Sequence, residues 1–586
     1  MHHGIRTMHL LNKELPPQSG GVLNPTVKQG AWSRSMGACG LKLRLFLIGL
    51  SLGVVFSACE EEVPLIVSID PQVGTIGEVL TIRGNNFGHE QDESYITIAG
   101  TSPTFSSYIE WTNESISLTI PEFGASGLVY VHRGDKKSNP AIFSNRATMP
   151  EPVSVADLGS GPRIRSVEPG SGSIGSLVTI MGNGFGSSRE GSGVFFSWDT
   201  AALTLMPMEA PKSEQLEVFE TEFGYELWSE REIRVRVPDG AASGDLEVRT
   251  SRGTSMPAIF TVSGKPGTKT FKDKRTYTIS YTVNIQAQVA TLPNTLYLWV
   301  PHPVTSAAQR NIELMSRNRE PFVEYYRGAT LFQFHDLGAK SGVGINLSYR
   351  VDVYTIETTL KSSSIRQING SPIPALYTLP SVLIPSDNPL VVAQTNAIIG
   401  RESNPYEKAQ KLYEWLIQEG GIQVSPLNNG AVEALEEKRG DSYSAALLFC
   451  AMARAARVPA IPVAGVLIDR SRSTSRHYWA EFWIDGFGWI PVDPALGAGA
   501  APADFNLRGG TEANHEAAAY YFGNLDNQRI AFSRGQGIFS QMDPRGRLAV
   551  RNREYALQNL WEEAVGGLES YSSLWSDITI TGMYVQ

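Results

Sequence analysis

Apolar and polar residues alternate in short segments through much of the chain. Segments 79–82, 116–120 and 128–131 show this alternation between glycines and prolines, and it returns at 277–283. A period of two places one side of an extended backbone against a core and the other side in solvent, so each segment predicts a β-strand. We therefore expect short strands of a β-sandwich early in the chain and a separate all-β module over 270–360.

The spacing of apolar residues becomes helical after residue 400. Asn404 can accept hydrogen bonds at a helix start, Pro405 suits the first helical position, and Glu407 has the spacing of a capping box. Glycines at 420 and 421 should end this helix.

A second helix is predicted to begin at Asp441 or Ser442. Its apolar residues keep helical spacing: Ala445, Leu448, Phe449, Met452 and Ala456. Ser442 is therefore expected at a helix N-terminus, where unpaired backbone N–H groups gather.

One run of residues occurs twice. Landmarks in its first half recur 98 residues later: Pro71 as Pro169, Gly77 as Gly175, and Phe87 as Phe185. Landmarks in its second half recur 117 residues later: Pro121 as Pro238, Gly127 as Gly244, and Phe143 as Phe260. Such self-similarity indicates two copies of one domain. Because the offsets differ by 19, we predict an insertion of that length between Ser187 and Arg231.

The repeated segments resemble the IPT/TIG immunoglobulin-like family. The resemblance rests on Ile69-Asp70-Pro71, Gly74-Thr75-Ile76-Gly77 and Gly84-Asn85-Asn86-Phe87-Gly88, each with a counterpart in the second copy. It implies β-sandwich domains that serve as spacers or interaction modules. The glycines are expected at turns that need a positive φ angle.

Three motifs near the C-terminus carry candidate chemistry. They are Arg439-Gly440-Asp441-Ser442, then Arg476-His477-Tyr478-Trp479, then Gly488-Trp489-Ile490-Pro491-Val492-Asp493-Pro494. In order and setting they resemble the transglutaminase-like (papain-like) family, whose nucleophile is a cysteine after Gly-Asp. The resemblance implies a catalytic triad of Ser442, His477 and Asp493 in this chain, with Asp441, Trp479 and Trp489 as supporting residues.

Serine at the nucleophile position changes the chemistry. A thiol with a pKa near ~8.5 is drawn toward thiolate by a helix N-terminus and a neighbouring imidazolium. A hydroxyl is far less acidic, so His477 would have to remove its proton during attack. Cys450 cannot replace the missing thiol, because it lies about 12 Å further along the helix on another face. We expect Cys450 to be a buried core residue.

A further group of polar residues follows the triad, namely Asp526, Arg529 and Arg534. They could line a substrate groove, but we expect surface ion pairs. We find no cluster of histidine, cysteine or carboxylate residues at metal-ligand spacing, so no metal or cofactor is expected.

The N-terminal region predicts export. Residues 45–56 are apolar, follow Lys42 and Arg44, and lead to Ser57-Ala58-Cys59. This layout is typical of a secretory signal, and its end resembles the bacterial lipobox, which implies a lipid on Cys59. Cys39 lies in the expected signal and Cys450 in the mature chain, so no disulfide framework is expected. The net charge of −9, without basic clusters, argues against nucleic-acid binding.

The predicted organisation is multidomain: two all-β immunoglobulin-like sandwiches, an all-β module and an α+β transglutaminase-like (papain-like) core. The expected divisions are 1–35 leader or mis-assigned start, 36–58 lipoprotein signal peptide, 59–65 linker, 66–146 and 162–263 IPT/TIG domains, 270–360 β-domain, 390–540 core and 541–586 C-terminal extension.

Three functions stay open at the level of sequence. The first is a cell-envelope lipoprotein, periplasmic or on the outer surface and anchored through Cys59, whose core is silenced at Ser442 and binds protein, peptide or glycan. The second is an active Ser-His-Asp amide or ester hydrolase or acyltransferase. The third is an adhesion or scaffold protein that relies on the IPT/TIG domains.

Overall fold

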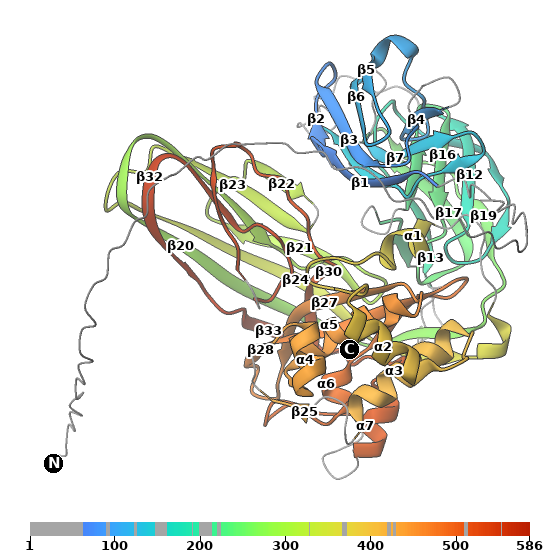
Figure 1. Ribbon diagram of the computed structural model, residues 1–586, viewed down its shortest axis with the longest axis vertical. Helices are drawn as coiled ribbons and strands as arrows, with labels where there is room; N and C mark the ends of the chain where they lie inside the picture. The colour runs from blue at the N-terminus through green and yellow to red at the C-terminus, as the bar shows by residue number, and fades with distance from the viewer. Residues whose placement is uncertain are drawn as a thin grey trace, which may run out of the picture. The chain divides into compact units, whose positions relative to one another are not determined.

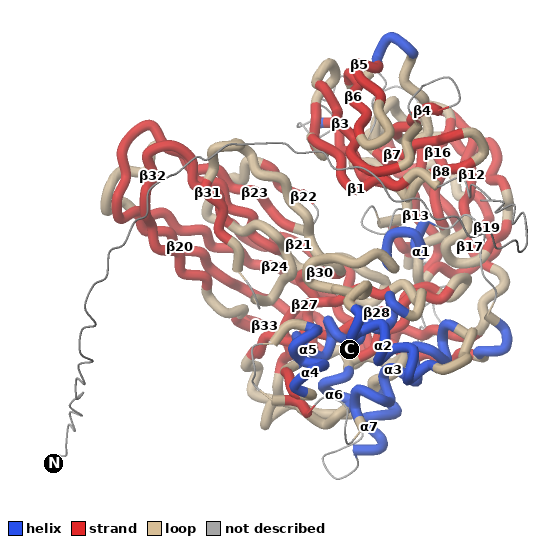
Figure 2. The backbone as a smooth tube through the Cα atoms, in the orientation of Figure 1, coloured by secondary structure: helices blue, strands red, loops and turns tan. Residues whose placement is uncertain are grey.

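Strands dominate the computed structural model (Figures 1 and 2). It describes residues 63–88, 94–121, 126–146, 161–189, 191–198, 214–219, 224–326, 328–365, 372–418, 423–425, 429–508, 514–551 and 554–585. Strands hold 51% of the chain and helices 14%, which confirms the predicted fold class. The leader, the signal peptide and Cys59 lie outside the described residues. Among the described helices, none is both long and apolar enough to cross a membrane.

The first repeat folds as two packed sheets. One sheet has the order β1 (Leu65–Asp70), β3 (Val79–Asn85), β6 (Ser115–Thr119), β5 (Tyr108–Trp111). The other has the order β2 (Val73–Gly74), β9 (Ala141–Asn145), β7 (Gly127–Arg133), β4 (Ser94–Ile98), and β8 (Lys136–Lys137) pairs with β7. Leu80 and Ile82 are fully buried between the sheets, which explains their alternation with Thr81.

The second repeat has a closely similar arrangement. One sheet has the order β10 (Arg163–Glu168), β12 (Leu177–Asn183), β16 (Glu232–Arg236), β15 (Tyr225–Trp228). The other has the order β11 (Ser171–Gly172), β19 (Ala258–Val262), β17 (Ala241–Thr250), β13 (Gly193–Trp198), β14 (Gln215–Glu217), with β18 (Gly253–Thr254) on β17.

Equivalent hydrogen bonds locate the insertion more narrowly than the sequence did. The hydroxyl of Tyr108 accepts from Ile96 N–H at 3.0 Å, and the hydroxyl of Tyr225 accepts from Val194 N–H at 2.9 Å. The acceptors stand 117 residues apart and the donors 98 residues apart. The additional residues therefore lie between Val194 and Tyr225, and they include strand β14.

The β-module is completed by the end of the chain. Its eight-stranded sheet contains β21 (Gln309–Arg317), β24 (Gly342–Leu360), β20 (Gly267–Pro301), β23 (Ala329–His335), β22 (Val323–Tyr326), β31 (Arg547–Ala549), β32 (Glu562–Trp575) and β33 (Thr579–Val585). β32 and β33 both pair with β20 in antiparallel register. The segment 541–586, which we expected only as an extension, thus supplies strands to this sheet.

The last part of the fold places helices against a four-stranded sheet (Figure 2). The sheet has the order β29 (Gly488–Val492), β28 (Thr474–Ile484), β27 (Ala460–Ile468), β30 (Arg529–Arg534). The helices are α1 (Pro372–Tyr377), α2 (Pro389–Ile399), α3 (Pro405–Ile417), α4 (Ala431–Glu437), α5 (Ser442–Ala455), α6 (Pro494–Gly497) and α7 (Asn514–Tyr520). A short parallel pair, β25 (Gln423–Val424) and β26 (Arg439–Gly440), precedes α5.

The two predicted helices form with one difference at a cap. Asn404 accepts from Tyr406 N–H and Glu407 N–H at the start of α3, as predicted. The predicted capping box is wrong, because Asn404 N–H donates to the Glu402 carboxylate at 3.0 Å and not to Glu407. Helix α5 begins at Ser442 and is buried from Tyr443 to Arg454, so it is the central helix of this part.

Candidate functional site

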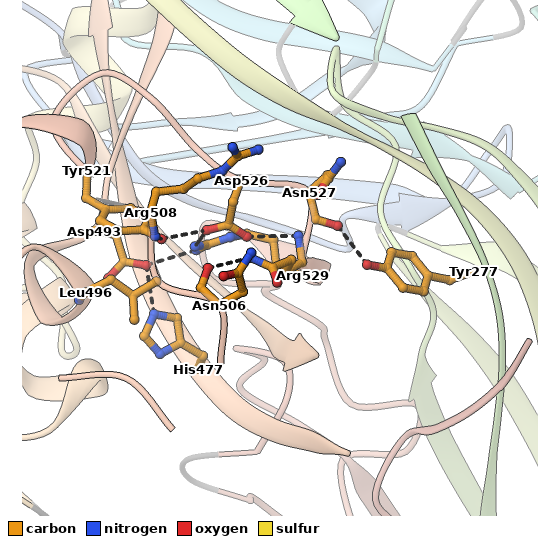
Figure 3. A network of polar contacts seen from close by, with 11 residues as sticks. Tyr277, His477, Asp493, Leu496, Asn506, Arg508, Tyr521, Asp526, Asn527 and Arg529 are labelled. Atoms are coloured by element: carbon orange, nitrogen blue, oxygen red, sulfur yellow. Dashed lines mark hydrogen bonds and ion pairs between the residues drawn. The ribbon is translucent and has the colours of Figure 1, made fainter. Parts of the chain in front are cut away.

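A histidine and an aspartate form a buried pair beside the sheet (Figure 3). His477 lies on β28, and Asp493 directly follows β29. These strands are antiparallel with Ala480 opposite Val492, so the two segments run side by side. His477 Nε2 lies 2.8 Å from Asp493 Oδ2. The structure therefore brings together the second and third residues of the predicted triad.

Asp493 is ionised, because its surroundings stabilise the charge. Its Oδ1 accepts from Leu496 N–H at 3.0 Å, and its Oδ2 accepts from Arg529 Nη1 at 2.9 Å as well as from His477. Burial alone would raise the pKa of Asp493, but His477, the Arg529 guanidinium and Leu496 N–H together lower it to about 2. A carboxylate only accepts hydrogen bonds, so the His477 proton in this contact is on Nε2.

This arrangement fixes which ring nitrogen could act as a base. A neutral imidazole that carries its proton on Nε2 offers the lone pair of Nδ1. Within the described residues, His477 Nδ1 makes no hydrogen bond. The pair can thus orient a general base toward a nucleophile or a ligand, but it does not itself supply the nucleophile.

The predicted nucleophile position lies next to the strand that carries the histidine. Ser442 is the first residue of α5, and Asp441 caps this helix by accepting from Ser444 N–H at 3.1 Å. The ring of Tyr443 contacts the ring of Tyr478 with centroids 5.0 Å apart, so the residues that follow Ser442 and His477 touch. Across the described part of the chain, Ser442 Oγ makes no hydrogen bond, and none joins it to His477.

Two other groups near this position are excluded as nucleophiles. Ser444 is fully buried and donates its hydroxyl to Asn429 O at 2.6 Å. Cys450 is fully buried, and burial raises the pKa of its thiol to about 12. Cys450 is a core residue, as its flanking sequence predicted.

The two predicted supporting tryptophans lie in different places. Trp479 lies beside His477, with ring centroids 6.3 Å apart and an interplanar angle of 22°. Trp489 lies opposite Trp483 in the sheet. Trp483 is six residues after His477 on β28, which places it about 20 Å from His477 along the strand at ~3.3 Å per residue. Its ring contacts Trp483 and Tyr377, so the structure does not bring Trp489 to the histidine.

The expected surface ion pairs are buried, so that expectation is wrong. Arg529 Nη2 lies 2.6 Å from Asp526 Oδ2, and the two side chains are 2% and 0% exposed. Arg534 pairs with Glu481 at 2.6 Å, and both side chains are also largely buried. Arg529 is the first residue of β30, and it is buried together with the next three residues, Ile530 to Phe532. Because Arg529 follows the polar Gln528, the local sequence gave no sign that its side chain is buried.

Models of two known families match this chain, one in its C-terminal part and one in its N-terminal part. Residues 392–494 match the transglutaminase-like superfamily, which covers the described dyad and the start of α5. The chain carries a transglutaminase-like domain. Residues 64–144 and 162–209 match the IPT/TIG domain, so this domain follows two immunoglobulin-like sandwiches.

The individual proteins that resemble this chain share low sequence identity with it. An uncharacterized protein of Haemophilus influenzae is 28% identical over 163 residues, which are 23% of this chain and 44% of that protein. The chain thus spans less than half the length of this relative. A candidate cysteine protease from Cytophaga hutchinsonii covers 54% of this chain and 92% of its own, at 17% identity and a TM-score of 0.33. The periplasmic domain of TgpA from Pseudomonas aeruginosa covers 38% and 89%, at 14% identity and a TM-score of 0.23.

Proposed function

We propose that this chain is a cell-envelope lipoprotein whose transglutaminase-like domain is silenced at Ser442 and binds a protein, peptide or glycan. The observation that carries the proposal is the state of the nucleophile position. Ser442 occupies it, and within the described residues its hydroxyl makes no hydrogen bond to His477. A serine needs that contact more than a cysteine does, because its proton must leave during attack.

The setting of Ser442 favours a thiolate over a hydroxyl. The start of α5 offers the backbone N–H groups of a 14-residue helix, a setting that lowers the pKa of a thiol. A hydroxyl is not ionised by such a helix end. Ser444 and Cys450 are both buried, so neither of these two residues of α5 can replace the missing thiol.

The proposed location rests on the N-terminal sequence. The apolar segment 45–56 ends at Ser57-Ala58-Cys59, as a lipoprotein signal does. Expression in a bacterial host with a labelled fatty acid tests this point. The natural chain should incorporate label and partition into detergent, and Cys59→Ala should do neither. Label that persists in Cys59→Ala would refute anchoring at this residue.

Restoring the thiol tests the silencing. We would compare the natural chain, Ser442→Cys and Ser442→Ala on glutamine and peptide-amide substrates, with thiol labelling at near-neutral pH. Silencing predicts turnover and a reactive thiol only in Ser442→Cys, because the dyad is in place and lacks a suitable nucleophile. Cys450 provides an internal blank, since its buried thiol should stay unlabelled in all three proteins.

A second candidate, a Ser-His-Asp hydrolase or acyltransferase, is favoured by one observation. The His477–Asp493 pair is intact, buried and ionised at Asp493, which is what a serine nucleophile would need from its partners. This candidate predicts stoichiometric labelling of the natural chain by a fluorophosphonate probe, lost in Ser442→Ala and strongly reduced in His477→Ala. Turnover by the natural chain that Ser442→Cys does not improve would decide for it.

A further inference from the structure

A buried arginine extends the dyad by one residue beyond Asp493. Arg529 lies on β30, and its guanidinium reaches Asp493 Oδ2 through Nη1 at 2.9 Å. Its Nη2 reaches Asp526 Oδ2 at 2.6 Å. The same guanidinium lies 5.0 Å from the ring centre of Trp479, which itself lies against His477. Figure 3 shows this chain of contacts from His477 through Asp493 and Arg529 to Asp526.

Arg529 and His477 share one oxygen of Asp493. Both donate to Oδ2, while Oδ1 is occupied by Leu496 N–H. The carboxylate therefore has little freedom to rotate, since each oxygen is bound by a donor on a different element. A planar guanidinium with two donors in a fixed fork can hold two carboxylates in a set geometry, which an ammonium group cannot do as well.

Arg529 is itself held in place by its second carboxylate. Asp526 Oδ2 also accepts from the Tyr521 hydroxyl at 3.1 Å, and Asp526 Oδ1 accepts from Gln528 N–H at 2.8 Å. The next residue, Asn527, accepts at its backbone oxygen from the hydroxyl of Tyr277 on β20 at 2.9 Å. The loop before β30 is thus fixed on two sides.

We propose that Arg529 is a positioning residue for the His477–Asp493 dyad, and that Asp526 and Tyr521 hold Arg529 for this role. Arg529 keeps Asp493 ionised and oriented, and Asp493 in turn keeps the His477 proton on Nε2. Arg529 thus helps to orient His477 as a base. This role is the same whether position 442 carries the natural serine or a cysteine. A merely structural role, in which Arg529 only neutralises buried charge, would leave the state of His477 unchanged in any variant that folds.

The state of the imidazole can be measured in the natural chain. Nitrogen-15 NMR of histidine-labelled protein distinguishes the two tautomers, and His477→Gln identifies the signal among the nine histidines. We expect a single tautomer with the proton on Nε2 in the natural chain and a mixture in Arg529→Met. Arg529→Lys, which keeps the cation but not the two-donor fork, should recover only part of the natural signal. Arg534→Met is the matched control, because it breaks a buried arginine–glutamate pair on the same strand without touching Asp493.

Reactivity gives a second measurement, and this part rests on the proposed function because it needs Ser442→Cys. Iodoacetamide alkylates a thiolate: the sulfur bonds to the methylene carbon, iodide leaves, and His477 takes the thiol proton. Adding Arg529→Met to Ser442→Cys should lower the alkylation rate by ~10- to 100-fold, less than the ~10⁴-fold loss that follows when an orienting carboxylate is altered. Adding Arg534→Met should change it less than about twofold.

The two proposals fail in different ways. Turnover by the natural chain would refute silencing and leave the role of Arg529 intact. An unchanged tautomer and an unchanged alkylation rate in folded Arg529→Met would refute positioning and leave silencing intact. If Arg529→Met does not fold, Asp526→Asn takes its place: it releases the anchor of Arg529 without changing Asp493. Positioning then predicts a several-fold slower alkylation, and an unchanged rate would refute it.

Discussion

The low pKa of Asp493 makes a definite prediction about stability and pH. A carboxyl whose pKa falls from 3.8 to about 2 on folding contributes about 2.5 kcal/mol to the free energy of unfolding at neutral pH. The folded state binds this proton less readily than the unfolded state does. The contribution is therefore complete above about pH 4 and is lost as pH falls through the folded pKa near 2.

Asp493→Asn removes this pH-dependent contribution. The variant should be less stable at pH 7, by ~2–4 kcal/mol, because the hydrogen bonds from His477 and Arg529 to the carboxylate are lost or weakened, while Arg529 keeps its ion pair with Asp526. Between pH 5 and pH 2.5 the difference between the two proteins should shrink by about 1.5 kcal/mol, and the rest is lost only as the pH falls below the folded pKa. Urea unfolding followed by tryptophan fluorescence at pH 7, 5, 3.5 and 2.5 gives both quantities, and the transition that moves in Asp493→Asn belongs to the transglutaminase-like domain.

A carboxyl with a similar pKa in a largely solvent-exposed ion pair serves as the control. Arg545 lowers the pKa of Asp543 to about 2 through a side-chain hydrogen bond, but Arg545 is 85% exposed. Solvent and salt screen such a pair, so Asp543→Asn should have little effect at any pH. If the natural protein and Asp493→Asn lose stability in parallel from pH 5 to pH 2, Asp493 does not have the low pKa that the geometry gives it.

Three further predictions concern residues away from the dyad. Cys450 should resist thiol reagents at pH 8 in the folded chain and react on addition of urea, because burial raises the pKa of its thiol to about 12; a kinetic thiol assay checks this. Removing residues 541–586 should destabilise the β-module and expose the edge of β20, because β32 and β33 pair with that strand; far-ultraviolet circular dichroism and aggregation measure the loss. Tyr225→Phe should destabilise the second sandwich by ~1–3 kcal/mol, because the buried Val194 N–H loses its acceptor, and calorimetry against Tyr108→Phe in the first sandwich checks it.

Local patterns predicted the elements well because their causes are local. Alternation located β3 and β6, and an asparagine before a proline located the start of α3. Backbone period and capping can both be read within short windows of sequence. The meeting of His477 and Asp493 was implied by the resemblance to the transglutaminase-like family, and the two side chains lie 2.8 Å apart.

Long-range contacts were not predictable in this way. The pairing of β32 with β20 joins residues about 290 positions apart, such as Val283 and Trp575, and no local period signals it. The burial of Arg529 depends on two carboxylates brought from other segments, so the sequence around it resembles that of an exposed strand. Trp489 shares a motif with Asp493, yet its side chain lies far along the sheet from His477.

Because these charges are buried, the presence of an intact His477–Asp493 pair does not by itself indicate catalysis. Asp493, Arg529 and Asp526 form a connected group with almost no exposure, and removing Arg529 leaves two buried carboxylates without their cation, at a cost of ~3–5 kcal/mol. Replacing Asp493 removes the acceptor of Arg529 and of Leu496 N–H, so it weakens the fold whether or not the site is used. His477 donates to the same oxygen and shares this constraint. The dyad thus contributes to stability in both proposed functions, and position 442, which makes no such contact within the described residues, discriminates most directly between a binding site and a hydrolase.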